Sequence, residues 1–158
     1  HRIGAVGMAA RASGLERDLR SSHSGRVYGS LLVHDPVVES SGDVYARLKV
    51  RMREAVQSIG HVRTMLDLLD SQSRVSCPPD YGMKLAADSL AFSLVEGWRG
   101  EICHVALTDP EGHVKAYKIV DPSVHNWTAL ALSVRGIGIS DFPICNKSFN
   151  LSYCGHDL

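Results

Sequence analysis

Closely spaced cysteine pairs are missing from this sequence of 158 residues. It has four cysteines, Cys77, Cys103, Cys145 and Cys154, and no Cys-x-x-Cys motif. Disulfide-bonded scaffolds and zinc ribbons are built from such pairs, so the spacing argues against both. It is typical of a protein kept in a reducing, cytoplasmic setting.

Long apolar runs, net charge and common catalytic motifs are also missing. No stretch is long and apolar enough to cross a membrane. The formal charge is zero and 44% of the residues are hydrophobic, which argues against a disordered chain and against nucleic acid as a partner. Because there is no Walker A loop, no Gly-x-Ser-x-Gly and no His-Glu-x-x-His, no motif assigns a catalytic residue.

The chain is long enough for one domain with a core, over residues 1–158. Residues 1–63 carry ten Lys and Arg against six Asp and Glu, whereas residues 64–158 carry seven against eleven. This asymmetry suits docking against partner proteins, although it is also common in ordinary enzymes. Because the sequence starts with His1 and not with Met, we expect it to be a piece of a longer protein.

The most prominent stretch runs from Asp43 to Ser71 and predicts one long helix. Its apolar residues recur at steps of three or four. They are Val44, Leu48, Met52, Ala55, Val56, Ile59, Val62, Leu66 and Leu69. The other side carries the basic residues Arg47, Lys49, Arg51, Arg53 and Arg63. The simplest interpretation is a core helix with a buried apolar face and a solvated basic face.

The other stretches predict shorter elements, and together with the long helix they indicate an α+β fold. The clearest is an antiparallel hairpin in a three-stranded sheet, followed by a helix that Asn126 would cap and by an irregular tail. The hairpin pairs Glu101–Leu107 with His113–Val120, the third strand is Leu90–Glu96, the helix is Trp127–Val134 and the tail is Ile139–Leu158. Weaker patterns predict short helices at Leu15–Arg20, capped by Ser13, and at Met83–Leu90, an extended piece at Ser30–Val38, and a break at Gln72–Asp80. The Gly- and Ala-rich stretch Ile3–Gly14 suits a buried turn beside a site or interface.

Two groups of residues are candidates for chemistry. Arg11, Arg17, Asp18 and Arg20 lie close together in the sequence, either as surface ion pairs or as charges lining a cavity. In the tail, Cys154, His156 and Asp157 could bind zinc or nickel, although a buried thiol beside a surface histidine is the simpler interpretation.

A series of spaced motifs resembles one protein superfamily from Gly4 to Leu158. The motifs are Ala10-Arg-Ala-Ser-Gly14 with Asp18 and Arg20, Ser41-Gly-Asp43-Val-Tyr45-Ala-Arg47, Val95-Glu-Gly-Trp-Arg-Gly100-Glu101, Asp121-Pro-Ser and Ser140-Asp141. They are similar to the large subunit of membrane-bound nickel–iron hydrogenases and to the 49-kDa (D) subunit of NADH:quinone oxidoreductase, respiratory complex I. The tail is most similar to the formate-hydrogenlyase and hydrogenase-4 branch.

The resemblance implies the C-terminal domain of an oxidoreductase subunit, a bundle of long helices with a small sheet, into which the C-terminus folds back. It implies as partners the N-terminal part of the same subunit, an iron–sulfur small subunit and membrane-arm subunits. The chain would lie peripherally at the cytoplasmic side of the inner membrane. Iron–sulfur clusters would be held by partner subunits, and quinone by the parent complex. The alternative is a non-catalytic scaffold between the peripheral and membrane arms.

The resemblance also implies a degenerate nickel site. Active hydrogenases bind nickel and iron through two Cys-x-x-Cys pairs, and Ser152 and Gly155 stand where the second pair belongs, with Cys154 displaced by one position. We therefore expect no nickel. The former cavity would be lined by Arg11, Asp18, Arg20, Arg99, Ser152, Cys154 and Asp157. We expect Arg99 to bind a carboxylate or carbonyl of the tail through both arms of its guanidinium, next to Trp98, which replaces the proline of the family.

Overall fold

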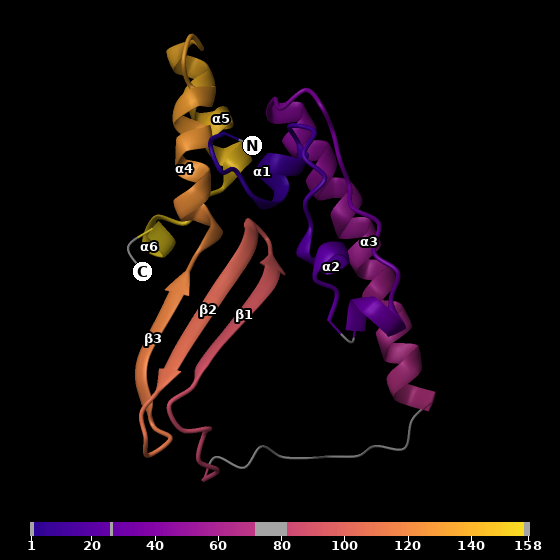
Figure 1. Ribbon diagram of the computed structural model, residues 1–158. Coiled ribbons are helices and arrows are strands. Elements are labelled where there is room, and N and C mark those ends of the chain that lie inside the picture. The colour runs from indigo at the N-terminus through magenta and orange to yellow at the C-terminus, as the bar shows by residue number, and fades with distance from the viewer. Residues whose placement is uncertain (1, 26, 72–81, 157–158) are drawn as a thin grey trace.

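The computed structural model describes residues 2–25, 27–71 and 82–156, as an α+β arrangement of short helices, one long helix and one sheet (Figure 1). In chain order the helices are α1 Gly7–Arg11, α2 Leu19–Ser22, a π-helical turn Val27–Leu31, α3 Val44–Ser71, α4 Pro122–Ser133, a 3-10 turn Ile139–Asp141, α5 Phe142–Phe149 and α6 Tyr153–His156. The strands are β1 Leu90–Gly97, β2 Gly100–Thr108 and β3 Val114–Val120. The break expected at Gln72–Asp80 lies outside the described residues.

Helix α3 confirms the long helix to within one residue. Its first turn is capped by the side chain of Asp43, whose Oδ1 accepts a hydrogen bond from the Ala46 amide at 2.7 Å. The next longest helix of the described chain is α4, with 12 residues against 28 in α3. Within the described residues, none of the helices combines the length and the apolar character needed to span a membrane.

The simplest interpretation of α3, a core helix with a buried apolar face, does not hold within the described chain. Ala46 and Val50 are fully buried against Met8 and Ala12, and Arg47 is only 3% exposed. The small side chains of Ala46 and Val50 let α1 approach closely. This narrow face of α3 therefore packs against the rest of the described chain, and the wide apolar stripe does not. Members of that stripe are largely exposed: Leu48, Met52, Val56, Ile59, Val62, Leu66 and Leu69.

The sheet confirms the hairpin and the third strand. Its order is β1-β2-β3 and both pairs are antiparallel, with Leu90 opposite Leu107 at one end and Gly97 opposite Gly100 at the other. The turn between β2 and β3 is held by Asp109, whose Oδ1 accepts from the amides of Glu111 and His113 at 3.0 and 2.8 Å.

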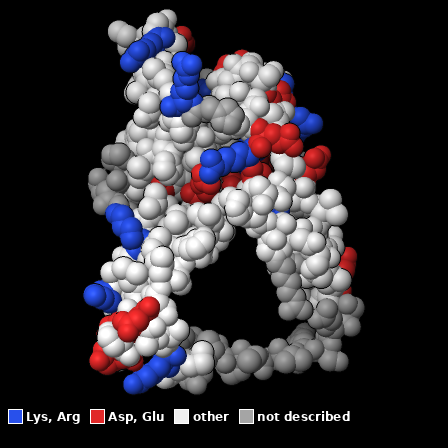
Figure 2. Space-filling model, viewed as in Figure 1, with Lys and Arg blue, Asp and Glu red and all other residues white. Residues whose placement is uncertain are grey.

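The buried core lies at one end of the molecule, where α1, α4, α5 and the β1–β2 turn meet (Figure 1). Its main apolar cluster consists of Ala9, Ala129, Leu130, Cys145, Phe149 and Leu151. From this end the sheet and α3 extend on opposite sides, and Figure 2 shows an opening between them. Large apolar residues of β1 face solvent, Phe92 at 72% exposed among them.

Helix α4 starts earlier than predicted, because Asp121 is its N-cap and not Asn126. The side chain of Asp121 accepts from the Ser123 amide at 2.7 Å, and Pro122 occupies the first helical turn, where a missing amide costs nothing. Asn126 is buried inside the helix. Its Oδ1 accepts from the Val6 amide at 3.0 Å and its Nδ2 donates to the Arg99 carbonyl at 3.1 Å. The sequence suggests that Asn126 is a helix cap, but its side chain instead bonds two backbone groups that are distant in sequence.

The weaker local predictions also need correction. Helix α2 begins at Leu19 with Asp18 as its cap, so the helix expected at Leu15–Arg20 with Ser13 as cap is wrong in both respects. No strand forms at Ser30–Val38, and residues 83–89 are not helical. The tail is not irregular but contains α5 and α6. Local propensity is a weak guide to elements this short.

The exposed apolar stripe of α3 predicts association of the 158-residue chain expressed by itself. A contiguous apolar surface of this kind is unusual on a monomer. We expect the chain to self-associate and to bind an apolar reporter dye. Met52→Gln with Ile59→Gln should reduce both effects, whereas Arg63→Gln on the exposed polar side should not. A dye-silent monomer at high concentration would contradict this account.

Candidate functional site

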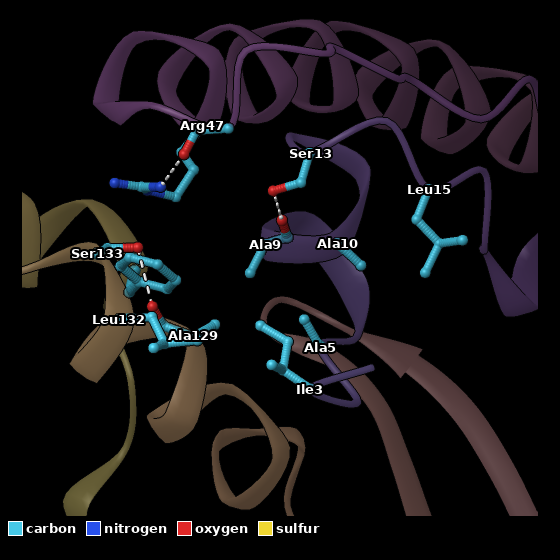
Figure 3. A pocket seen from close by; sticks show the side chains of 12 residues that line it. Ile3, Ala5, Ala9, Ala10, Ser13, Leu15, Arg47, Ala129, Leu132 and Ser133 are labelled. Carbon is cyan, nitrogen blue, oxygen red and sulfur yellow. Dashed lines mark hydrogen bonds between the residues drawn. The ribbon is translucent and has the colours of Figure 1, made fainter. Parts of the chain in front are cut away.

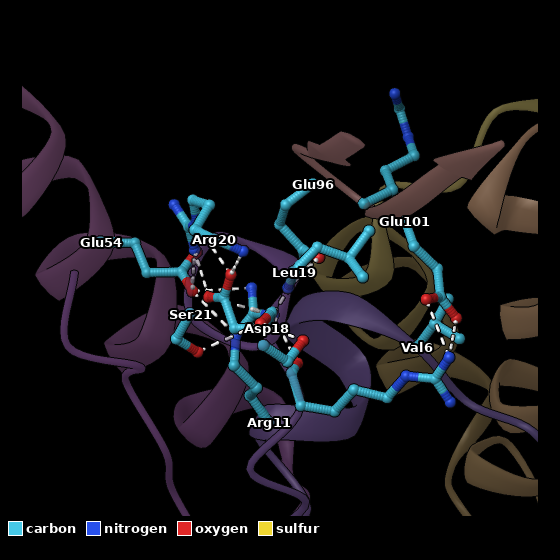
Figure 4. Close-up of polar contacts among 12 residues, drawn as sticks. Val6, Arg11, Asp18, Leu19, Arg20, Ser21, Glu54, Glu96 and Glu101 are labelled. Carbon is cyan, nitrogen blue, oxygen red and sulfur yellow. Dashed lines mark hydrogen bonds and ion pairs between the residues drawn. The ribbon is translucent and has the colours of Figure 1, made fainter. Parts of the chain in front are cut away.

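Arg11, the last residue of α1, is the centre of a buried network of charges (Figure 4). Its side chain is 1% exposed. The guanidinium binds Glu54 of α3 through Nη2 at 2.7 Å and Nε at 2.9 Å, and Glu96 of β1 through Nη1 at 2.8 Å. Nη1 also donates to the Arg17 carbonyl at 3.0 Å. One arginine therefore joins α1, α3 and the sheet.

Asp18 is the second fully buried member of the network. Its side chain caps α2. Its two carboxylate oxygens also accept hydrogen bonds from the Arg20 guanidinium, from Nε at 2.9 Å and from Nη2 at 2.6 Å. Arg11 Nη1 lies 3.5 Å from Asp18 Oδ2. Burial alone would raise the pKa of Asp18, but the hydrogen bonds from Arg20 and the charges of Arg11 and Arg20 outweigh it. The pKa is held far below its ordinary value, so Asp18 is ionised.

Glu96, at the end of β1, is in the opposite condition. Its side chain is 3% exposed, and its Oε2 accepts from the Leu19 amide at 3.2 Å. Burial raises the pKa of Glu96 more than the charge of Arg11 lowers it. The network contains two guanidiniums, Arg11 and Arg20, against three carboxylates. One proton held by Glu96 would make it electrically neutral.

His34 closes the network on the side of α3. Its Nε2 lies 3.0 Å from Asp18 Oδ2, and its ring packs edge-on against Tyr28 and His61, with centroids 5.9 and 5.6 Å away. Burial lowers the pKa of His34, and so does the charge of Arg20, against the opposing effect of Asp18. The imidazole is therefore neutral at pH 7, donates from Nε2 to Asp18, and presents Nδ1 as an acceptor with no partner among the described residues.

Three arginines hold the tail at the point where α5 ends. Arg47 Nε donates to Ser148 Oγ at 2.8 Å, Arg51 Nη2 to the Phe149 carbonyl at 2.9 Å, and Arg99 Nε to the Asn150 carbonyl. The expectation that Arg99 binds a tail carbonyl is thus confirmed. The bidentate geometry is not, because Nε alone makes this contact with the described part of the tail.

The tail that follows does not fit a nickel ion. The Ser152 hydroxyl oxygen accepts from the Gly155 amide at 3.0 Å, and Cys154 is exposed. A Cβ at Gly155 would lie 2.5 Å from Cγ of Asp121, so the cap of α4 fills the space that a cysteine side chain would need. A hydroxyl, a glycine and an outward thiol are not the thiolate set that nickel selects.

A hollow beside α1 is lined mainly by apolar side chains (Figure 3). It has a volume of about 290 Å³ and lies between α1 and α4, with Arg47 and Phe149 at its edge. Of the residues predicted to line a cavity, none of the six that the structure describes belongs to it. Its apolar walls offer no group for acid–base or metal chemistry.

The structure divides the predicted site residues into two places. Arg11, Asp18 and Arg20 meet in the buried network and not in ion pairs at the surface. Arg17 is separate from them, with its side chain 54% exposed and paired with Glu101 at 2.7 Å. Arg99 and Ser152 lie at the tail, and Cys154 points to solvent. Asp157 lies outside the described residues.

Sequence reasoning missed Glu54, Glu96 and His34. Glu54 carried a signal, because it is the only acidic residue of α3 before Asp67 and stands among basic ones. Glu96 lies within a motif but was not singled out from it. Nothing in the sequence around His34 indicated burial, since its partners Asp18 and His61 are distant.

Comparison with known proteins places the chain among respiratory subunits. The family model described as "Respiratory-chain NADH dehydrogenase, 49 Kd subunit" matches residues 1–89. The carbon monoxide-induced hydrogenase of Rhodospirillum rubrum is 31% identical over 148 residues, which cover 93% of this chain and 39% of that protein. Formate hydrogenlyase subunit 5 of Escherichia coli is 29% identical over 148 residues, or 94% of this chain and 25% of that one.

A solved structure agrees with these relatives. A chain of the membrane-bound sulfane sulfur reductase, an archaeal respiratory membrane complex, superposes with a TM-score of 0.83 at 25% identity. The match covers 98% of the chain described above and 43% of the other. The present chain thus spans between a quarter and two fifths of the length of the two curated relatives.

The buried state of His34 predicts a specific dependence of stability on pH. The pKa of His34 is lowered on folding. His34 therefore takes up a proton near pH 6.5 in the unfolded chain, but only at a lower pH in the folded chain. The free energy of unfolding should therefore fall as the pH drops below 6.5, by up to about 1.4 kcal/mol per pH unit from this one group. His34→Gln should remove that part of the slope, measured by urea unfolding between pH 5 and 7.5.

His125→Gln is the matched control, because His125 is exposed on α4. It should leave the slope as it is in the parent protein. Glu96, whose raised pKa acts in the opposite sense, is common to all three proteins and drops out of the comparison. Equal slopes in the parent and in His34→Gln would show that His34 titrates normally.

Proposed function

The chain belongs to the family of the 49-kDa subunit of respiratory-chain NADH dehydrogenase, and on that premise we propose that it is the C-terminal domain of the large subunit of a membrane-associated electron-transfer complex. The subunit is of the kind found in hydrogenases and NADH:quinone oxidoreductases, and its nickel site is degenerate. The relatives named above and the superposition over 98% of the chain support the first part.

The observation that carries the second part is the packing of Gly155 against Asp121. The position that would need a thiolate has no side chain, and the space beside it is filled by the carboxylate that caps α4. Restoring a cysteine there would displace the cap, which contributes roughly 1 kcal/mol to such a helix. In this proposal the site is organised around other contacts, and Ser152, Cys154 and Gly155 hold no metal.

In this proposal the rest of the subunit covers the surfaces that the described chain leaves open. These are the apolar stripe of α3 from Met52 to Leu69 and the exposed faces of β1, and these two elements lie on either side of the opening in Figure 2. Iron–sulfur clusters are held by a partner small subunit, and quinone by the parent complex. Membrane-arm subunits attach the whole to the cytoplasmic side of the inner membrane.

The buried network has a positioning role. Through Arg11 it fixes α3 to the end of β1, and the β1–β2 turn next to it carries Arg99 to the tail. The network is thus connected to the tail through Glu96, Gly97 and the β1–β2 turn. In this proposal that connection holds the tail in its position. A non-catalytic scaffold is the second candidate, and the filled position at Gly155 favours it because no reactive group replaces the lost thiolate.

The nickel content of the whole complex, purified from its own host, tests this proposal. We expect no stoichiometric nickel in the subunit and unchanged electron transfer in Cys154→Ser, because an exposed thiol has no part in the reaction. One nickel per subunit, lost in Cys154→Ser, would overturn the degenerate site. Electron transfer from donor to acceptor by the assembled complex distinguishes the two candidates. A complex that contains an oxidoreductase component transfers electrons, whereas a complex built on a scaffold assembles but transfers none.

A further inference from the structure

Four basic side chains gather around the C-terminal end of α5 without a carboxylate partner. Arg47 and Arg51 come from α3, Arg99 from the β1–β2 turn and Lys147 from α5 itself. Within residues 2–25, 27–71 and 82–156, none of the four forms an ion pair. This distinguishes them from Arg11 and Arg20, which are held by carboxylates in the buried network.

The acceptors of their hydrogen bonds are neutral groups, most of them at the end of α5. The carbonyls of Phe149 and Asn150 and the hydroxyl of Ser148 take one hydrogen bond each from the three arginines. Arg47 also donates to the Gly42 carbonyl at 2.7 Å and to the sulfur of Cys145 at 3.9 Å, and the charge of Asp43 acts on it through space. A helix C-terminus carries the equivalent of roughly half a negative charge, which does not balance four positive ones. Glu54 acts on Arg51 through space, but its carboxylate is already bound by Arg11 and Arg20.

Arg51 has hydrogen-bonding capacity that the described chain does not use. Its guanidinium has five N–H donors and makes one hydrogen bond in the described chain, to the Phe149 carbonyl. Its Nε is buried and has no acceptor there. Burial lowers the pKa of Arg51, and the positive charges of Arg99 and Arg47 lower it further, so the cluster repels itself. The bond to the Phe149 carbonyl caps α5 and accounts for one donor of Arg51. The other donors and the positive charge of the cluster have no such explanation.

A pocket of about 410 Å³ lies against this charge. Arg51 and Lys147 supply its basic part, and its walls are the apolar side chains of Val44, Leu48 and Ile144 with the indole of Trp98. The guanidinium carbon of Arg51 stacks 5.1 Å from the centre of the Trp98 ring. The pocket thus combines an uncompensated cationic end with an aromatic and aliphatic wall, which suits a ligand with a charged head and an apolar body.

We propose that this pocket binds an amphiphilic oxyanion, with its phosphate or carboxylate head on Arg51 and Lys147 and its apolar body against Trp98, Leu48 and Ile144. The planar guanidinium fork of Arg51 matches such a head in geometry as well as charge. The head neutralises charge that the described chain leaves unbalanced. A soluble metabolite and a lipid share this chemistry, and the choice between them is an outcome of the test.

Isothermal titration calorimetry on the purified full-length protein separates the two halves of the ligand. The probes are octyl phosphate, inorganic phosphate and octanol. We expect octyl phosphate to bind at least about tenfold more tightly than either other probe, because each half alone forgoes one set of contacts, and more weakly as salt screens the head group. Equal binding of inorganic phosphate and octyl phosphate would refute the apolar part of the site, and equal binding of octanol would refute the anionic part. No binding at all would show that a protein carboxylate or nothing occupies the pocket, and would overturn the proposal.

Three variants attach the binding to these residues. Arg51→Gln and Lys147→Gln should each weaken octyl phosphate about tenfold, as expected for a lost charge-assisted hydrogen bond. Arg63→Gln, also on α3 but exposed and outside the pocket, should leave it unchanged. Lys147 is exposed, so its variant remains informative if Arg51→Gln fails to fold. An equal loss in Arg63→Gln, or none in Lys147→Gln, contradicts the site. Tighter binding of short-chain phosphatidic acid than of octyl phosphate identifies the lipid form, and the reverse order identifies a soluble anion.

Discussion

The ion pairs of Arg11 are the constraint on which the rest of the described chain depends. The guanidinium touches carboxylates of α3 and β1 and the carbonyl of Arg17, and it is almost completely withdrawn from water. Removing one partner of a buried ion pair is costly, roughly 3–5 kcal/mol, because the others stay buried without compensation. Since α1 and β1 are distant in sequence, this one side chain sets how the sheet and the long helix are placed relative to each other.

Small residues make that placement physically possible. A Cβ at Gly7 would lie 2.2 Å from Cα of Gly100, so α1 and the β1–β2 turn are in backbone contact and neither position tolerates a side chain. On the other flank of α1, Ala46 and Val50 give α3 its close approach. The buried arginine can reach Glu54 and Glu96 together only because both approaches are this close. The same turn extends Arg99 to the tail on the far side.

The sequence predicted elements well where the signal is local and repeated. The long helix and the hairpin were recovered because periodicity and turn residues determine them. It failed at the burial of α3, since hydrophobicity favoured the wide stripe of Leu48 and Met52, whereas close packing selected Ala46 and Val50. It failed again at Asn126 and His34, whose roles depend on Val6 and Asp18. In the buried network the sequence singled out Arg11, Asp18 and Arg20, and it missed Glu54, Glu96 and His34.

A double-mutant cycle between Arg11 and Glu96 is the most direct test of the central claim, that one buried ion network couples α1 to the sheet. The free energy of unfolding of the purified protein is measured for Arg11→Met, Glu96→Gln, the double variant and the parent. Coupled neighbours give interaction energies of about 0.5–3 kcal/mol, and a pair this buried belongs at the upper end. We predict that the double variant is about 2 kcal/mol more stable than the sum of the two single losses implies. Additive losses, within about 0.5 kcal/mol, would show that the two residues stabilise the protein independently and would contradict the account.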